Sequence, residues 1–63
     1  SRDEELKKFV VAGLPGVNTK IADRMMESFQ TVEDVFTAER EDLKEIEGVG
    51  EKKADTIRKL LTE

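Results

Sequence analysis

The sequence predicts an all-α fold, a compact five-helix bundle formed by a single domain of 63 residues. Apolar residues recur at the spacing of helix faces along most of the chain, and β-branched runs are short. Only 37% of the residues are hydrophobic. A core drawn from so few residues offsets the conformational entropy of folding only if its elements are compact and mostly helical.

The first two helices are predicted from apolar stripes and a cap. Leu6, Phe9 and Val10 stand at i, i+3 and i+4, and Ser1 precedes Glu4 by three residues, the spacing of a capping box. A second stripe consists of Ile21, Ala22, Met25, Met26 and Phe29. We expect its methionines and phenylalanine to form core, or the seam of a dimer, rather than a cofactor site.

Three further helices complete the bundle. Thr31 is placed to cap a helix of one or two turns that carries Val35 and Phe36. Thr37 is placed to cap another short helix, which leads to Leu43. The last helix runs nearly to the end of the chain, with apolar residues at Ala54, Ile57, Leu60 and Leu61.

Two of the breaks between helices repeat each other at an offset of 32 residues. The segment that begins at Leu14 matches the segment that begins at Ile46 at five of ten positions. The identical pairs are Gly16 and Gly48, Val17 and Val49, Lys20 and Lys52, Ala22 and Ala54, and Asp23 and Asp55. The chain therefore contains two copies of one helix-turn-helix unit.

Each repeated turn is built to reverse the chain tightly and expose its backbone. Gly16 and Gly48 can adopt positive φ without a Cβ penalty, and the valine after each glycine can point inward as an anchor. Asn18 and Gly50 stand where the next helix begins. Unpaired amides at the start of a helix, together with the helix dipole, favour an anion.

Lysines follow both turns at the same distance. Lys20 and Lys52 stand two residues past the turn, within reach of a neighbouring phosphate, and each has one companion. Arg24 shares a helix face with Lys20, and Lys53 adjoins Lys52. The alternatives are an ordinary tight turn and a solvated helix face; two copies with matching lysines favour the anion site. Lys7 and Lys8 have no counterpart in the repeat, so we expect them only to solvate their helix.

The segments 14–18, 31–36 and 46–54 carry a resemblance to a known family. They read Leu-Pro-Gly-Val-Asn, Thr-Val-Glu-Asp-Val-Phe and Ile-Glu-Gly-Val-Gly-Glu-Lys-Lys-Ala. The first and last resemble the hairpins of a tandem helix-hairpin-helix domain. All three together are similar to the C-terminal domain of the XPF/Mus81 structure-specific endonucleases, and most to archaeal Hef and XPF-type proteins.

The resemblance covers about residues 6–61 and implies a definite organisation. Two pseudo-symmetric helix-hairpin-helix motifs are joined by a short connector helix, with hairpin 1 at about residues 14–18 and hairpin 2 at about residues 46–50. Residues 1–63 then form one such domain. Since the chain begins at Ser1, we expect it to be one part of a larger protein.

The resemblance also implies a function. In that family the domain binds duplex, forked or junction DNA without reading its sequence, with hairpin amides on phosphates across the minor groove. Nuclease chemistry belongs to a separate domain whose signature is absent here, so no catalytic residue is expected. The DNA-binding residues so implied are Gly16, Val17, Asn18, Lys20, Arg24, Gly48, Val49, Gly50, Lys52 and Lys53. The resemblance also implies a role in DNA repair inside a cell, in the cytoplasm or nucleoid of a prokaryote or in a eukaryotic nucleus.

A second function stays open beside DNA binding. Domains of this family commonly pair, so a homodimer or another helix-hairpin-helix subunit is an expected partner. The alternative is therefore a helical protein-interaction or dimerisation module whose hairpins are only structural.

Composition excludes several other kinds of function. The chain has no cysteine and no histidine, which removes disulfides, thiol catalysis, the usual zinc sites and histidine acid–base chemistry. Adjacent carboxylate pairs, such as Glu41 and Asp42, project in different directions on a helix and do not form a metal site. We therefore predict no cofactor, no metal, no membrane contact and no small-molecule substrate.

Taken as a whole, the net charge of −4 argues against a phosphate partner, but this charge is unevenly distributed along the chain. Residues 1–26 sum to +1, residues 27–47 to −6 and residues 48–63 to +1. The acidity is thus confined to the connector, which we expect to be turned largely away from DNA. We also expect hairpin 2 to bind more strongly, because it has both glycines and two adjacent lysines, provided that Glu51 points away.

Overall fold

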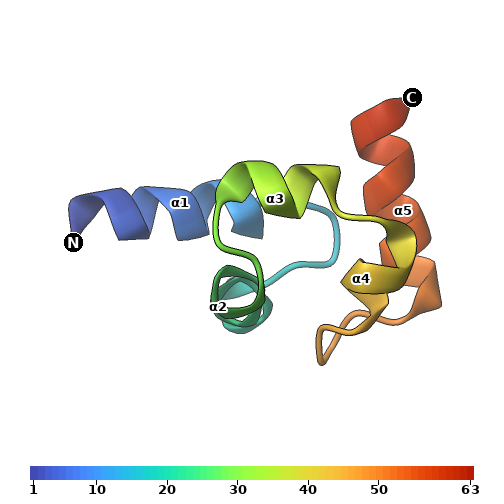
Figure 1. Ribbon diagram of the computed structural model, residues 1–63, viewed down its shortest axis with the longest axis horizontal. Coiled ribbons are helices and arrows are strands. Elements are labelled where there is room, and N and C mark those ends of the chain that lie inside the picture. Colours follow the sequence, from blue (N-terminus) through green and yellow to red (C-terminus); the bar gives the residue numbers. More distant parts are fainter.

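Five helices joined by short turns, with no strand, make up the computed structural model, which describes all 63 residues (Figure 1). They are α1 (Arg2–Ala12), α2 (Thr19–Ser28), α3 (Val32–Thr37), α4 (Arg40–Lys44) and α5 (Glu51–Thr62). The molecule measures 31 × 23 × 18 Å. Helices α1 and α5 lie toward opposite ends of its long axis, with α2 and α3 between them and α4 beside α5 (Figure 1). The all-α, five-helix prediction is confirmed.

Three helices begin with a side-chain cap that the sequence predicts. In each case a side-chain oxygen accepts a hydrogen bond from an amide that has no partner within the helix. The bonds run from Glu4 N to Ser1 Oγ (3.3 Å), from Ile21 N to Asn18 Oδ1 (2.8 Å) and from Asp34 N to Thr31 Oγ1 (3.0 Å). These caps fix where α1, α2 and α3 begin.

The start of α4 differs from its prediction. Thr37 is the last residue of α3, and its hydroxyl donates to the carbonyl of Glu33 at 2.9 Å. The residue before α4 is Glu39, which makes no side-chain cap. A threonine hydroxyl readily bonds the carbonyl one turn back within its own helix, and here that local bond prevails over a capping role.

The core consists of thirteen buried residues, all of them apolar, and no charged or polar side chain is buried. Every helix contributes one large, completely buried side chain: Val11, Met25, Val35, Leu43 and Ile57. Burying such a side chain stabilises a protein by roughly 1.5–3 kcal/mol. Because the five come from five helices, each helix is held to the same cluster, and the two repeated turns are fixed around it.

The apolar stripe of α1 does not lie in this core. Helix α1 is present as predicted, but Leu6, Phe9 and Val10 are exposed, Phe9 at 78%. Only Val11 of this helix is buried, and the N-terminal part of α1 extends away from the other helices (Figure 1). An apolar face on an exposed helix remains uncovered. No helix in the chain is long and apolar enough to span a bilayer.

Candidate functional site

The two hairpins have the same backbone geometry. Gly16 has a φ of 76° and Gly48 a φ of 96°, and no other residue in the chain has a positive φ. Each turn is closed by one hydrogen bond from the following valine, Val17 N to Leu14 O at 3.1 Å and Val49 N to Ile46 O at 2.9 Å. The left-handed conformation predicted for the two glycines is confirmed.

Val17 and Val49 serve the turn itself. Their side chains are 6% and 4% exposed and belong to the core, as expected of anchors. Their amides are already used in closing the turn. Neither the side chain nor the N–H of either valine is free to meet a ligand, which corrects their place among the predicted contact residues.

Free amides lie just beyond each valine, and hairpin 2 has one more of them. In hairpin 1 the amides of residues 18–20 make no hydrogen bond within the protein, and the next one is capped by Asn18. In hairpin 2 the amides of residues 50–53 are all free, because Gly50 has no side chain with which to cap α5. Four successive N–H groups therefore stand at the positive end of the α5 dipole.

Both hairpins open onto one shallow groove of about 460 Å³. Its lining comes from both repeats and includes three of the four glycines of the chain: Pro15, Gly16, Gly48, Gly50, Lys52, Lys53 and Thr56. No large apolar side chain enters it. Hairpin 1 contributes Pro15 and Gly16 to this groove, and its free amides at residues 18–20 lie outside the lining.

Each hairpin turn packs against a side chain from the other copy of the repeat. A Cβ placed at Gly16 would lie 3.1 Å from side-chain carbons of Lys53, and one at Gly48 would lie 3.1 Å from side-chain carbons of Ile21. Ile21 and Lys53 occupy the same position in the two copies of the repeat. Each turn is thus covered by the helix that follows the other turn, and the distance between them is fixed by contact.

Two of the predicted phosphate-binding cations are engaged with hairpin 2 of the protein itself. The Arg24 guanidinium donates to the Glu47 carbonyl at 3.0 Å, and its other nitrogen lies 3.7 Å from the Glu47 carboxylate. The Lys53 ammonium donates to the Gly48 carbonyl at 3.2 Å. Lys20 and Lys52, in contrast, are exposed and form no ion pair.

An ion-pair cluster between α4 and α5 stands beside hairpin 2, and sequence reasoning missed it. Lys44 Nζ lies 3.2 Å from Glu51 Oε1, and Arg40 donates through Nε to Asp55 and through Nη1 to Glu41 at 2.8 Å. The hydrogen bond to Glu51 raises the pKa of Lys44, and the bond to Asp55 raises the pKa of Arg40. Both cations lie in the acidic segment and outside the repeat, so no local pattern points to them.

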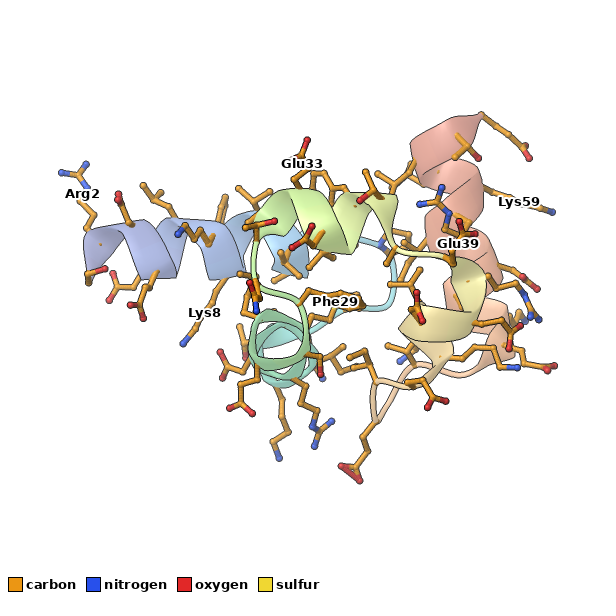
Figure 2. All side chains as sticks on the ribbon, in the orientation of Figure 1. Arg2, Lys8, Phe29, Glu33, Glu39 and Lys59 are labelled. Carbon is orange, nitrogen blue, oxygen red and sulfur yellow. The ribbon has the colours of Figure 1, made fainter.

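The acidic connector is arranged partly as predicted. Glu33, on α3, points away from the side of the molecule on which α2 and the loop of hairpin 2 lie (Figure 2). Glu47 also counts among residues 27–47, but it lies in hairpin 2, with its side chain 83% exposed. The connector as a whole is therefore not remote from the hairpins.

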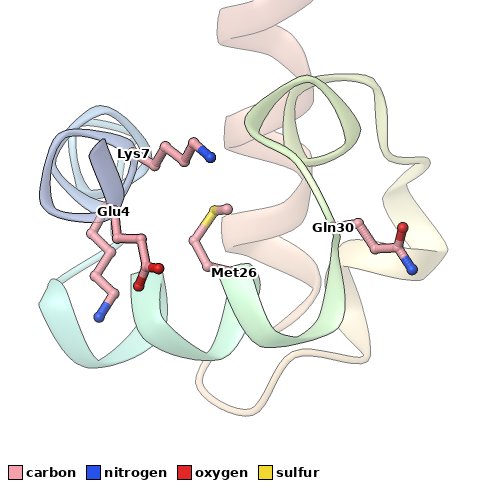
Figure 3. A pocket seen from close by; sticks show the side chains of 5 residues that line it. Glu4, Lys7, Met26 and Gln30 are labelled. Carbon is pink, nitrogen blue, oxygen red and sulfur yellow. The ribbon is translucent and has the colours of Figure 1, made fainter. Parts of the chain in front are cut away.

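A second hollow, between α1 and α2, involves neither hairpin. It measures about 220 Å³ and is lined by Glu4, Lys7, Lys8, Met26 and Gln30 (Figure 3). The Lys8 ammonium forms an ion pair at 3.1 Å with Asp23 on α2, and this bond raises the pKa of Lys8. These charges join two helices, and no three acidic side chains anywhere in the chain are grouped to hold a metal ion.

A known family and solved structures match nearly the whole chain. The family described as "SAM-like Helix-hairpin-helix tandem" matches residues 9–62. The solved structure of XPF from Aeropyrum pernix has a TM-score of 0.95 at 33% identity, over 100% of this chain and 32% of that one. The same protein in complex with DNA gives 0.88 at 33% identity, over 92% of this chain and 29% of that one. The predicted resemblance to archaeal XPF-type proteins is confirmed.

Curated relatives are DNA-processing and helicase proteins by name. A "Putative ATP-dependent RNA helicase" of Methanocaldococcus jannaschii is 48% identical over 94% of this chain. A DNA ligase of Chlamydia caviae is 36% identical over 90%, and UvrABC system protein C of a Thermoanaerobacter species is 31% identical over 89%. The chain spans only 8–9% of the length of these three relatives.

Proposed function

Because the chain belongs to the SAM-like helix-hairpin-helix tandem family, we propose that it binds DNA through its two hairpins without reading the base sequence. The observation that carries this proposal is the run of four free amides at residues 50–53. Gly50, Lys52 and Lys53 of this run line a groove together with Pro15 and Gly16 of hairpin 1. Backbone N–H groups and lysines recognise phosphates and carry no information about base edges. The similar XPF structure that holds DNA supports the same ligand.

The two hairpins would act on the two strands of one duplex. Each presents free amides at the start of a helix, where a phosphate accepts hydrogen bonds and meets the positive end of the dipole. The near-symmetry of the repeat matches the near-symmetry of two strands facing each other across a minor groove. Lys20 and Lys52, one beside each hairpin, are free to add charge at neighbouring phosphates.

Affinity in this arrangement comes from few charges and many amides. Of the four predicted cations, Lys20 and Lys52 are free, whereas Arg24 and Lys53 bond to carbonyls of hairpin 2. The affinity should therefore be modest, and log K falls by about 0.9 per log unit of salt for each phosphate neutralised. The net charge of −4 is unfavourable at long range, but the groove itself is lined by proline, glycine, lysine and threonine rather than by carboxylates. Duplex, forked and junction DNA are all candidate ligands.

We assign this domain a targeting role within a larger DNA-repair protein. It covers 29–32% of the XPF chains that it resembles, so it corresponds to one part of those proteins. A domain that grips phosphates in this way would bring a nuclease or helicase–nuclease to its substrate inside the cell. Cutting would be the work of another domain.

Amide chemical-shift titration with duplex, forked and single-stranded DNA tests the proposal. We expect the amide signals of residues 16–20 and 48–53 to shift on addition of DNA, and these shifts should weaken as salt is raised. The amide signals of α1 should not change. Shifts that depend only on protein concentration, with none on addition of DNA, would contradict it. The relative size of the shifts for the three DNA forms would also identify the preferred structure.

A specific observation favours the second candidate, an interaction or dimerisation module. Leu6, Phe9 and Val10 form an exposed apolar face on α1, which a second copy of the chain could cover. Sedimentation velocity over a range of protein concentrations tests it, with Phe9→Ser as the variant expected to abolish self-association. A monomer at all concentrations would remove this candidate and leave DNA binding unaffected.

A further inference from the structure

Glu51 poses an electrostatic difficulty for the proposed DNA site. It is the first residue of α5, so its carboxylate is attached at the point where the free amides of residues 51–53 begin. A carboxylate at the start of a helix is attracted to such amides and to the helix dipole. It would then occupy the donors offered to a phosphate and repel the phosphate itself. At the matching position of the repeat, hairpin 1 has the uncharged Thr19.

The structure holds this carboxylate on the other side, against α4. Glu51 Oε1 lies 3.2 Å from Lys44 Nζ and 3.9 Å from an Arg40 guanidinium nitrogen. Lys44 is the less exposed of the two partners, with its side chain 27% exposed against 37% for Arg40, and Glu41 lies 3.5 Å from the same ammonium. Arg40 is itself held by Asp55. The Glu51 side chain is 70% exposed, and its carboxylate lies beside two cations of the connector.

We propose that Lys44 is a positioning residue of the DNA site, which holds the Glu51 carboxylate against α4 and so keeps the N-terminus of α5 open to a phosphate. The inference rests on the proposed function. Lys44 does not line the groove between the hairpins, so it acts on DNA through Glu51 and not by contact. A residue of the acidic connector thus serves hairpin 2, which is the reason that a lysine stands there among carboxylates.

A double-mutant cycle separates this role from direct contact. Binding of a fluorescein-labelled duplex is measured by anisotropy over a range of salt for the wild type, Lys44→Met, Glu51→Gln and the double variant. We expect Lys44→Met to weaken binding about three- to tenfold, in the range of coupling between residues in contact. Glu51→Gln should bind at least as tightly as the wild type, and the double variant should bind like Glu51→Gln alone.

The salt slope separates positioning from direct contact with a phosphate. Loss of a phosphate contact lowers the slope of log K against log salt by about one, whereas Lys44→Met should leave the slope unchanged. Lys44→Arg should restore binding, because an arginine keeps the ion pair. Lys7→Met, which removes an exposed lysine of α1, is the matched control and should bind like the wild type.

Each contrary outcome identifies what has failed. Equal weakening by Lys44→Met in the wild-type and Glu51→Gln backgrounds, or a slope lowered by about one, would overturn the positioning role in favour of direct contact. Unchanged binding by Lys44→Met beside a wild type that binds would overturn it as well. A wild type that shows no salt-dependent binding would instead overturn the proposed function, and this inference with it.

Discussion

At the scale of single residues, the glycines of the two hairpins are held by different constraints. Gly16 and Gly48 have positive φ, and a Cβ at either position would meet a side chain at 3.1 Å. Gly50 has an extended backbone with a φ of −90° and nothing within 4 Å of its Cβ position. A side chain at position 50 would therefore cause no strain. Gly50 matters because it leaves the N-terminal amides of α5 uncapped.

Gly48→Ala is expected to destabilise the fold more than Gly16→Ala. Both substitutions force an L-residue into the left-handed region, which costs about 1–2 kcal/mol. At Gly48 the new Cβ also meets buried Ile21, whereas at Gly16 it meets the flexible stem of Lys53. Urea denaturation measures the difference; equal midpoints for the two variants would show that Ile21 moves aside freely.

Gly50→Asn is expected to change stability and DNA binding in opposite directions. An asparagine here would cap α5 as Asn18 caps α2, and it would stabilise the protein by a few tenths of a kcal/mol. The cap would occupy the Lys53 amide and remove one of the four free donors. Thermal denaturation and anisotropy on the same sample test this pair of effects. Tighter DNA binding by the variant would show that the free amide is not used.

At the scale of helices and turns, the parts predicted from sequence are those set by neighbouring residues. The caps at Ser1, Asn18 and Thr31 and the positive φ of the turn glycines depend on three or four consecutive positions. The contact from Arg24 to hairpin 2 joins a helix to a turn 23 positions away, and the contact from Lys44 to Glu51 joins two helices across 7 positions. No local pattern specifies such contacts, and the sequence therefore suggested a phosphate contact for Arg24 and none for Lys44.

Arg24→Gln and Lys20→Gln should weaken DNA binding in different ways. Arg24 donates to the Glu47 carbonyl, so its loss should destabilise the fold by about 1 kcal/mol and loosen hairpin 2 without lowering the salt slope. Lys20 is free, so its loss should leave stability unchanged and lower the slope by about 0.9. Salt titrations of both variants decide this. A lowered salt slope for Arg24→Gln would instead show that Arg24 contacts a phosphate.

At the scale of the whole molecule, overall composition and local geometry point to different partners. A net charge of −4 is unfavourable for binding a polyanion, yet both hairpins open onto a groove lined by glycines, lysines and a threonine. The core fixes the two hairpins on one face by contributing one buried side chain from each helix. Sequence reasoning predicted this paired arrangement from the repeat, but it did not predict the exposure of the α1 stripe, which depends on how far α1 extends beyond its neighbours.

The affinity of Lys52→Glu for duplex DNA, compared with that of Lys7→Glu at the same salt concentration, tests the central claim most directly. Each substitution takes the net charge from −4 to −6, so long-range repulsion changes equally and only the position differs. Lys52 lines the groove between the hairpins, and Lys7 lies on α1. Binding through the hairpins predicts a much larger loss for Lys52→Glu, with a lowered salt slope. Equal losses for the two variants would contradict it.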